Sequence, residues 1–172
     1  TANLGDLTLN YEAAVTAGSG DIQKLSASGT NGRFIANGFE TIAITTTGSS
    51  VTLADVMSTA LEKITVSGDH NLTLTEAVAA LTVDASALKG RLTLSATSVS
   101  GHTITSGLGD DNITGGANAD IISAGAGADT ITGGSGADTL NGGADNDNFI
   151  YLLTADLMTG QAKTDTLVTG GD

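Results

Sequence analysis

Five aspartates, each nine residues after the one before, are the residues of this chain whose type and spacing most clearly indicate chemistry. They are Asp111, Asp120, Asp129, Asp138 and Asp147. Each follows a glycine-rich stretch and precedes a large apolar residue by two positions. Hard cations bind oxygen ligands, and a carboxylate at a fixed distance from glycine-rich turns supplies them. The spacing therefore predicts a repeated cation site.

The aspartates belong to five nonapeptides that fill residues 106–150. They read SGLGDDNIT, GGANADIIS, AGAGADTIT, GGSGADTLN and GGADNDNFI, with Asp at position six. Position eight is always large and apolar: Ile113, Ile122, Ile131, Leu140 and Phe149. This is the pattern G-G-x-G-x-D-x-U-x, a known calcium-binding repeat. Glycine permits a sharp turn over the first six residues, so the last three are expected to form a strand with position eight inward.

Successive nonapeptides turn on opposite sides, so residues 18 apart stack at the inter-strand spacing of ~4.8 Å. Asp111 is then expected over Asp129, Asp129 over Asp147, and Asp120 over Asp138. Ionised carboxylates at such a distance repel, and burial adds to the cost. A bound cation removes the repulsion. Ca²⁺ suits the site because it accepts about 6–8 oxygen ligands in flexible geometry, whereas Mg²⁺ requires a tighter octahedron.

Backbone carbonyls of the turns are the other candidate ligands. The predicted donors are Gly107, Gly109, Gly116, Asn118, Gly125, Gly127, Gly134, Gly136 and Gly143. Asn118 and Asp145 replace glycine at position four, which leaves the sites near them less regular. Asp110 and Asp145 either add ligands at the edges or are solvated acids.

One repeat earlier in the same phase, His102 stands where the aspartate would be, so we expect calcium binding to end there. A turn histidine is the favoured interpretation of this residue, and a metal ligand the alternative. Asp21, Asp69 and Asp84 are expected in the upstream turns and are either turn formers or further calcium ligands.

The nonapeptides resemble the RTX family, whose members are calcium-binding parallel β-rolls that Gram-negative bacteria export by type I secretion. The Thr/Ser/Ala-rich upstream coils, the absence of Cys and the acidic balance resemble RTX surface-layer (S-layer) proteins of the Caulobacter type. The resemblance implies an extracellular or cell-surface location and an uncleaved C-terminal export signal beyond Asp172. The chain ends in a Gly-Gly-Asp sequence that looks like the start of another turn, so we expect it to be a fragment.

Composition excludes several classes of function. Nineteen acids against six bases give a net charge of −13, which disfavours nucleic acid as a partner. Without Cys there is no disulfide, thiol catalysis or Cys-ligated metal. The apolar runs are too short for membrane insertion, and no Sec-type signal peptide is visible.

The elements that position the aspartates are expected to be strands of a solenoid. Two interleaved columns of apolar residues run along the chain with spacings that fall from about 20 to 18. One contains Leu53, Leu74, Leu94, Ile113, Ile131 and Phe149, and the other Ile22, Ile42, Ile64, Val83, Ile104, Ile122 and Leu140. Two columns imply two strands per coil.

The sequence thus predicts an all-β fold, a parallel right-handed β-solenoid (β-helix) whose coils of roughly 20 residues pass into an RTX β-roll of 18-residue coils. Residues 1–105 form the solenoid, 106–150 the roll and 151–172 a capping segment, all in one domain, with the regular repeat ending at Ile150. Further strands are expected near Leu7–Tyr11, Ile22–Leu25 and Arg33–Ile35. Single helical turns are expected at the corners over residues 54–60, 76–80 and 86–89.

We expect no catalytic residues, because the chain lacks the common hydrolase and phosphate-loop motifs and a local Ser67, Asp69 and His70 cluster seldom forms a triad. The expected function is a calcium-binding subunit of an S-layer lattice. The expected partners are Ca²⁺ (several ions), further copies of the chain and cell-surface polysaccharide bound outside this fragment. The alternatives are the RTX region of a secreted enzyme or toxin, or a calcium-dependent adhesin.

Overall fold

The computed structural model describes residues 7–9, 21–29, 31–36, 38–57, 60–75, 81–96, 100–151, 157–159 and 166–169. All regular structure in these ranges is β-strand, and all strand pairing is parallel. The strands are β1 (Leu7–Leu9), β2 (Ile22–Ala27), β3 (Asn31–Ala36), β4 (Thr41–Thr46), β5 (Val51–Met57), β6 (Lys63–Gly68), β7 (Leu72–Leu74), β8 (Thr82–Leu88), β9 (Leu92–Ser95), β10 (Thr103–Thr105), β11 (Asn112–Ala117), β12 (Ile121–Ala126), β13 (Thr130–Ser135), β14 (Thr139–Ala144), β15 (Asn148–Tyr151), β16 (Leu157–Thr159) and β17 (Thr166–Thr169).

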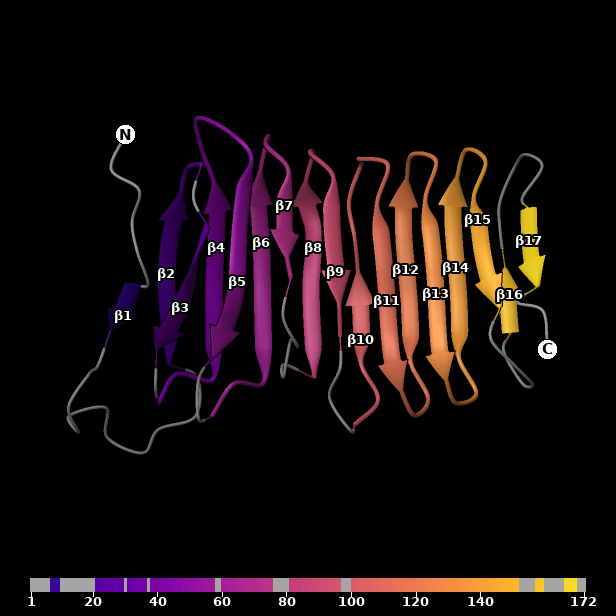
Figure 1. Ribbon diagram of the computed structural model, residues 1–172, viewed down its shortest axis with the longest axis horizontal. Helices are drawn as coiled ribbons and strands as arrows, with labels where there is room; N and C mark the ends of the chain where they lie inside the picture. Colours follow the sequence, from indigo (N-terminus) through magenta and orange to yellow (C-terminus); the bar gives the residue numbers. More distant parts are fainter. Residues whose placement is uncertain are drawn as a thin grey trace.

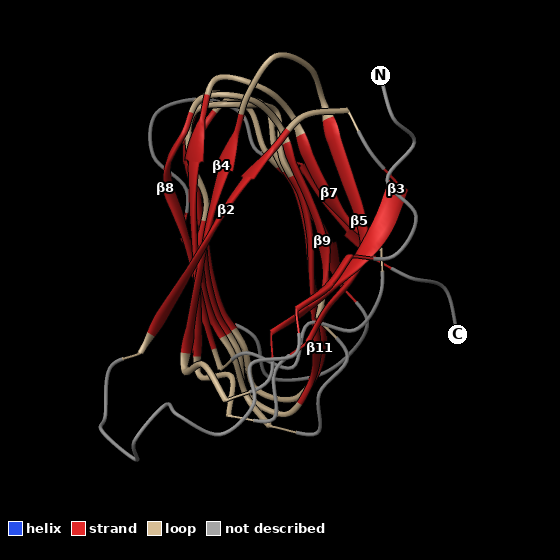
Figure 2. Ribbon diagram, turned by 90° about the vertical axis from the view of Figure 1, so that its left-hand side faces the viewer, coloured by secondary structure: helices blue, strands red, loops and turns tan. Residues whose placement is uncertain are grey.

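The strands form two sheets that run the length of the molecule. The odd-numbered strands make a nine-stranded sheet in the order β1 to β17, and the even-numbered strands make an eight-stranded sheet from β2 to β16. The two sheets face each other, as the end view shows, and their strands point in opposite directions (Figures 1 and 2). This is the predicted parallel β-solenoid, with β1 and β17 at opposite ends of its long axis (Figure 1).

The apolar columns predicted from the spacing are confirmed by the strand register, with one exception. Leu53, Leu74, Leu94, Ile113, Ile131 and Phe149 pair in succession along the nine-stranded sheet. In the other sheet the pairing runs from Ile42 to Leu140 as predicted. The prediction for Ile22 was wrong: this residue pairs with Thr41 and is 55% exposed, because β2 is displaced by one residue and a one-residue shift turns a side chain to the other face.

Those inward columns form the core. Between the sheets, Ile42, Ile64, Leu72, Leu92, Ile113 and Ile131 are completely buried. Outward residues between them are Thr, Ser and Asn along most strands, which gives the alternating burial of β7, β9 and β11. β-Branched and small polar residues suit such a half-buried pleated surface.

The predicted helical turns were wrong wherever the structure describes them. Residues 54–57 lie within β5, and residues 86–88 lie within β8. Helix propensity is a weak preference, and here it is overridden because residues 55–57 pair with β3 and residues 87–88 pair with β6. The segment 76–80 lies outside the described residues.

Strand pairing also continues beyond Ile150, where the regular repeat was predicted to end. Leu140 pairs with Met158, and Phe149 pairs with Leu167, both at the 18-residue offset of the nonapeptides. The described part of residues 151–172 therefore adds a strand to each sheet; the rest of this predicted cap lies outside the described residues. Within the described ranges, the structure contains no helix long and apolar enough to span a membrane.

Candidate metal centre

Each position-six aspartate directly precedes a strand. Asp111, Asp129 and Asp147 precede strands of the nine-stranded sheet, while Asp120 and Asp138 precede strands of the other. Because the two sheets run in opposite directions, the aspartates form two columns on opposite edges of the solenoid (Figure 1). All five are at most 2% exposed. The structure thus stacks the carboxylates as the spacing predicted.

Within each column, one oxygen of the carboxylate accepts a backbone hydrogen bond from the preceding coil. The N–H of Asp111 donates to Asp129 Oδ1 at 2.7 Å, and the N–H of Asp129 donates to Asp147 Oδ1 at 2.9 Å. In the other column the N–H of Asp120 donates to Asp138 Oδ1 at 2.9 Å. These bonds fix the orientation of each carboxylate. They also join successive coils at the turns, just before the strands begin.

The second oxygen of the carboxylate has no such donor at Asp120 and Asp129. Oδ2 of Asp120 and Oδ2 of Asp129 are buried without a hydrogen-bond partner. Burying a carboxylate oxygen without a partner costs free energy, and a cation bound beside the oxygen would remove that cost. Asp111 differs, because its Oδ2 accepts a hydrogen bond from Ser106 Oγ.

The position-one glycine Gly115 leaves room for the unpaired oxygen of Asp120. A Cβ on Gly115 would lie 2.5 Å from Asp120 Oδ2 and 2.6 Å from the carbonyl oxygen of Gly133, one coil further on. The carboxylate oxygen and the carbonyl oxygen therefore flank one small space. Gly133 was not among the predicted ligands, which were placed at positions two and four. Its role is visible only once the register brings position one of one coil against position six of another.

The position-two and position-four residues shape the turns. Gly134 has φ +107°, and a Cβ there would overlap the carbonyl oxygen of Gly116 in the preceding coil. Asn118 and Asp145, the two departures from glycine at position four, take φ values of 69° and 78°. Asn and Asp tolerate this left-handed region better than other residues. The departures thus preserve the turn.

The remaining predicted carbonyl donors lie in the same turns. The position-two and position-four residues of the five repeats all lie near the end of a strand or in the turn beside it. They are Gly107, Gly109, Gly116, Asn118, Gly125, Gly127, Gly134, Gly136, Gly143 and Asp145. Asp145 is exposed, and Asp110 Oδ1 accepts the N–H of Ala128 at 2.9 Å.

The electrostatics of the columns are those of an anionic site. The pKa of Asp129 is raised from 3.8 to about 7, chiefly by burial and also by the nearby carboxylates of Asp111, Asp147 and Asp110, while the Asp111 N–H opposes the shift. Burial likewise raises the pKa of Asp111, opposed by the hydrogen bonds from Ser106 and Leu92. Without a bound cation, burial therefore disfavours the ionised form of Asp111 and Asp129.

The arrangement fits a hard cation. Buried unpaired carboxylate oxygens beside turn carbonyls form an all-oxygen donor set, which calcium prefers. The position-six aspartates and the turn carbonyls around them would hold the ion, and its charge would offset the repulsion between stacked carboxylates. Among the described residues, no three His, Asp or Glu side chains converge on a single point.

Comparison with protein families agrees with this geometry. The family model of the RTX calcium-binding nonapeptide repeat (4 copies) matches residues 103–131 and 114–149. This part of the chain consists of RTX calcium-binding repeats. Repeats of this kind bind calcium and occur in secreted bacterial proteins. No curated protein and no solved structure matched the chain.

The nine-residue spacing of aspartates continues beyond Asp147, which was not predicted from the sequence. Asp156 and Asp165 stand nine and 18 residues after Asp147. The segments that follow them, β16 and β17, pair with β14 and β15 at the offset of the nonapeptides. The nine-residue spacing was the available signal, and the loss of glycine around these aspartates concealed it. Both residues lie outside the described ranges.

Upstream acids have other partners. Asp69 pairs with Lys89 at 2.8 Å, which lowers the Asp69 pKa. Asp84 was wrongly placed in a turn: it lies in β8 and pairs with Lys63 at 3.2 Å. Asp21 differs: its backbone N–H donates to Glu40 Oε2 at 3.0 Å, while its own Oδ2 is buried without a hydrogen-bond partner.

The Ser67, Asp69 and His70 cluster is not joined by hydrogen bonds in the structure. Ser67 Oγ lies 3.3 Å from Thr45 Oγ1, and Asp69 pairs with Lys89. His70 Nδ1 is buried without a hydrogen-bond partner. The three side chains therefore lack the relay of hydrogen bonds that defines a triad.

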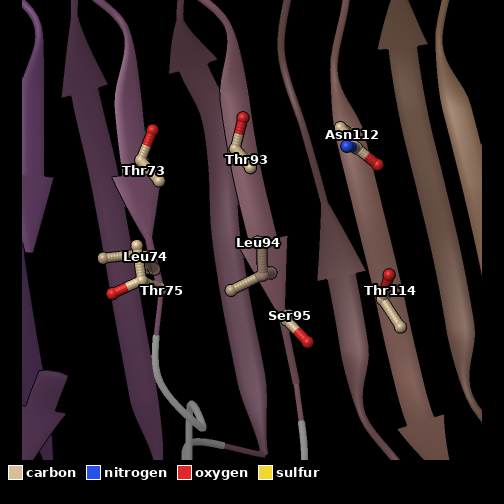
Figure 3. Close-up of a pocket in the computed structure, with 8 residues that line it drawn as sticks. All are labelled: Thr73, Leu74, Thr75, Thr93, Leu94, Ser95, Asn112 and Thr114. Atoms are coloured by element: carbon tan, nitrogen blue, oxygen red, sulfur yellow. The ribbon is translucent and has the colours of Figure 1, made fainter. Parts of the chain in front are cut away.

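A shallow hollow lies on the nine-stranded sheet, with a volume of about 240 Å³. Figure 3 shows its eight lining residues, which lie on β7, β9 and β11 or, for Thr75, directly after β7: Thr73, Leu74, Thr75, Thr93, Leu94, Ser95, Asn112 and Thr114. None of them carries an ionisable group, so this lining offers no general acid or base.

Proposed function

We propose that this chain is a calcium-binding structural subunit of an extracellular bacterial surface layer, in which calcium orders the roll after type I secretion. The observation that carries the proposal is the continuity of both sheets. The calcium-binding repeats β11 to β15 join the upstream coils through unbroken parallel pairing at β9·β11 and β8·β10·β12. The calcium-binding segment and the solenoid therefore share two continuous sheets, an arrangement that suits a lattice subunit.

Calcium would act as a folding switch in this role. Eleven of the 45 residues in the roll are glycine, and ordering glycine is entropically costly. The stacked carboxylates add repulsion. Extracellular modules bind Ca²⁺ with dissociation constants of about 10⁻⁴–10⁻³ M, so the roll would stay open in a calcium-poor cytosol and fold outside.

Circular dichroism during a calcium titration tests the switch. We expect β content to rise over the submillimolar to millimolar range and to fall when a chelator is added. Equal β content in chelator and in excess calcium would rule the switch out. Magnesium at the same concentrations is the control, and we expect a weaker response because it demands octahedral geometry.

Electron microscopy of the purified protein with calcium tests the lattice. Ordered two-dimensional sheets are expected for a surface-layer subunit. Dispersed monomers would contradict the lattice proposal and favour a roll that serves a secreted enzyme, toxin or adhesin, while leaving calcium binding intact. We propose no catalytic activity for the chain itself.

A further inference from the structure

His102 occupies the place of a position-six aspartate at the upstream end of one column. Thr103 pairs with Ile121 on one side and with Thr82 on the other, so the column runs Leu81, His102, Asp120. The N–H of His102 donates to Asp120 Oδ1 at 2.7 Å, as the N–H of Asp120 donates to Asp138. The backbone of His102 therefore occupies one position, or rung, of the aspartate column.

The side chain of His102 makes this rung different. Its Nδ1 lies 3.2 Å from Asp120 Oδ1, and both residues are at most 2% exposed. The imidazole thus lies directly against the carboxylate that it stacks on. Further upstream, Leu81 offers no ligand and is 46% exposed.

The other column ends in a comparable way. Leu92 donates its N–H to Asp111 Oδ1 at 2.6 Å, and Ser106 Oγ donates to Asp111 Oδ2. The first aspartate of each column therefore contacts a polar side chain of the protein, His102 or Ser106. Further along the column, Asp129 Oδ2 is buried without a hydrogen-bond partner.

We infer that His102 determines where the calcium column of the eight-stranded sheet begins, because its imidazole stands where the next carboxylate of the column would bind an ion. Calcium takes oxygen ligands, and an imidazole nitrogen is a poor substitute. The N–H hydrogen bond of His102 and the register of the strand that follows it match those of the downstream aspartates. Exchanging the side chain for a carboxylate should therefore create one more calcium site, between residues 102 and 120.

The inference rests on the proposed calcium binding, and its test compares three proteins. Calcium bound per chain is measured by equilibrium dialysis for the wild type, His102→Asp and His102→Asn. The Asn variant is the matched control, because it has the shape of Asp without the charge. We expect His102→Asp to bind one ion more than the wild type and His102→Asn to bind the same number as the wild type.

Each other outcome is decisive. If the wild type binds no calcium, the proposed function itself fails. If the wild type binds calcium and His102→Asp adds no ion, or if His102→Asn adds one as well, only the inference about His102 is overturned. Circular dichroism in excess calcium checks the fold. A His102→Asp variant that fails to reach wild-type β content also counts against the inference, since the rung should tolerate a calcium-bound carboxylate as the Asp120 rung does.

Discussion

The metal-free roll, which we expect to be open at neutral pH, should gain stability as the protein is acidified, and Asp129 is the main reason. Its pKa is raised from 3.8 to about 7 by burial and by Asp111, Asp147 and Asp110. The folded state therefore binds more protons than the unfolded state between these values, and stability falls as pH rises from about 4 to about 7. At ~1.4 kcal/mol per pH unit, the difference corresponds to at most about 4 kcal/mol.

Calcium should reverse the sign of this pH dependence. A carboxylate must be deprotonated to bind the ion, so the calcium-loaded protein should gain stability over the same pH range. Asp129→Asn removes the titrating group while keeping its shape. We expect this variant to be more stable than the wild type without metal at pH 7, and less stable than the wild type in excess calcium.

The assay is urea denaturation followed by circular dichroism at several pH values, on protein dialysed free of divalent ions and on the same protein with calcium. Asp145→Asn, at an exposed position-four residue, is the control and should follow the wild type more closely. The reasoning is refuted if metal-free wild type grows more stable from pH 4 to pH 7, or if Asp129→Asn has the same pH dependence as the wild type.

Two further substitutions test the turns. Ser106→Ala removes the donor to Asp111 Oδ2 and should destabilise the metal-free protein by about 1–3 kcal/mol, measured by urea denaturation at acidic pH, where we expect this protein to be folded; an unchanged midpoint would show that this contact is not stabilising. Gly134→Ala should lower the thermal midpoint with and without calcium, because its φ of +107° costs a side chain roughly 1–2 kcal/mol and its Cβ would overlap Gly116 O. Ser135→Ala, an exposed neighbour, is the control for both and should leave stability unchanged, and equal effects of Gly134→Ala and Ser135→Ala would contradict the steric argument.

The fold was predictable where one inward residue recurs at a nearly constant spacing along the chain. Leu74, Leu94 and Ile113 stand 20 and 19 residues apart, and apolar alternation around each fixes which face points inward. At Ile22 the spacing predicted the wrong residue, because Gln23 pairs with Ile42 instead. Side chains alternate between the two faces of a strand, so an error of one residue reverses the predicted face.

The candidate site was predictable in its carboxylates and less so in their surroundings. Asp111 and Asp129 follow from a nine-residue period alone. The approach of Gly133 to Asp120 depends on how adjacent coils are aligned, which a linear pattern does not contain. The contact of His102 with Asp120 depends on a side-chain orientation inside the stack. Both were accessible only in three dimensions.

The parallel stacking of both sheets also determines how the molecule would bear force. Hydrogen bonds between strands run along the long axis, so tension between the two ends falls on every coil-to-coil junction in series. Ions bridging successive coils at the two opposite edges would carry part of that load beside the backbone. We expect calcium to strengthen the junctions of residues 106–150, so that a chain pulled from its ends would yield first in the coils that lack these aspartates.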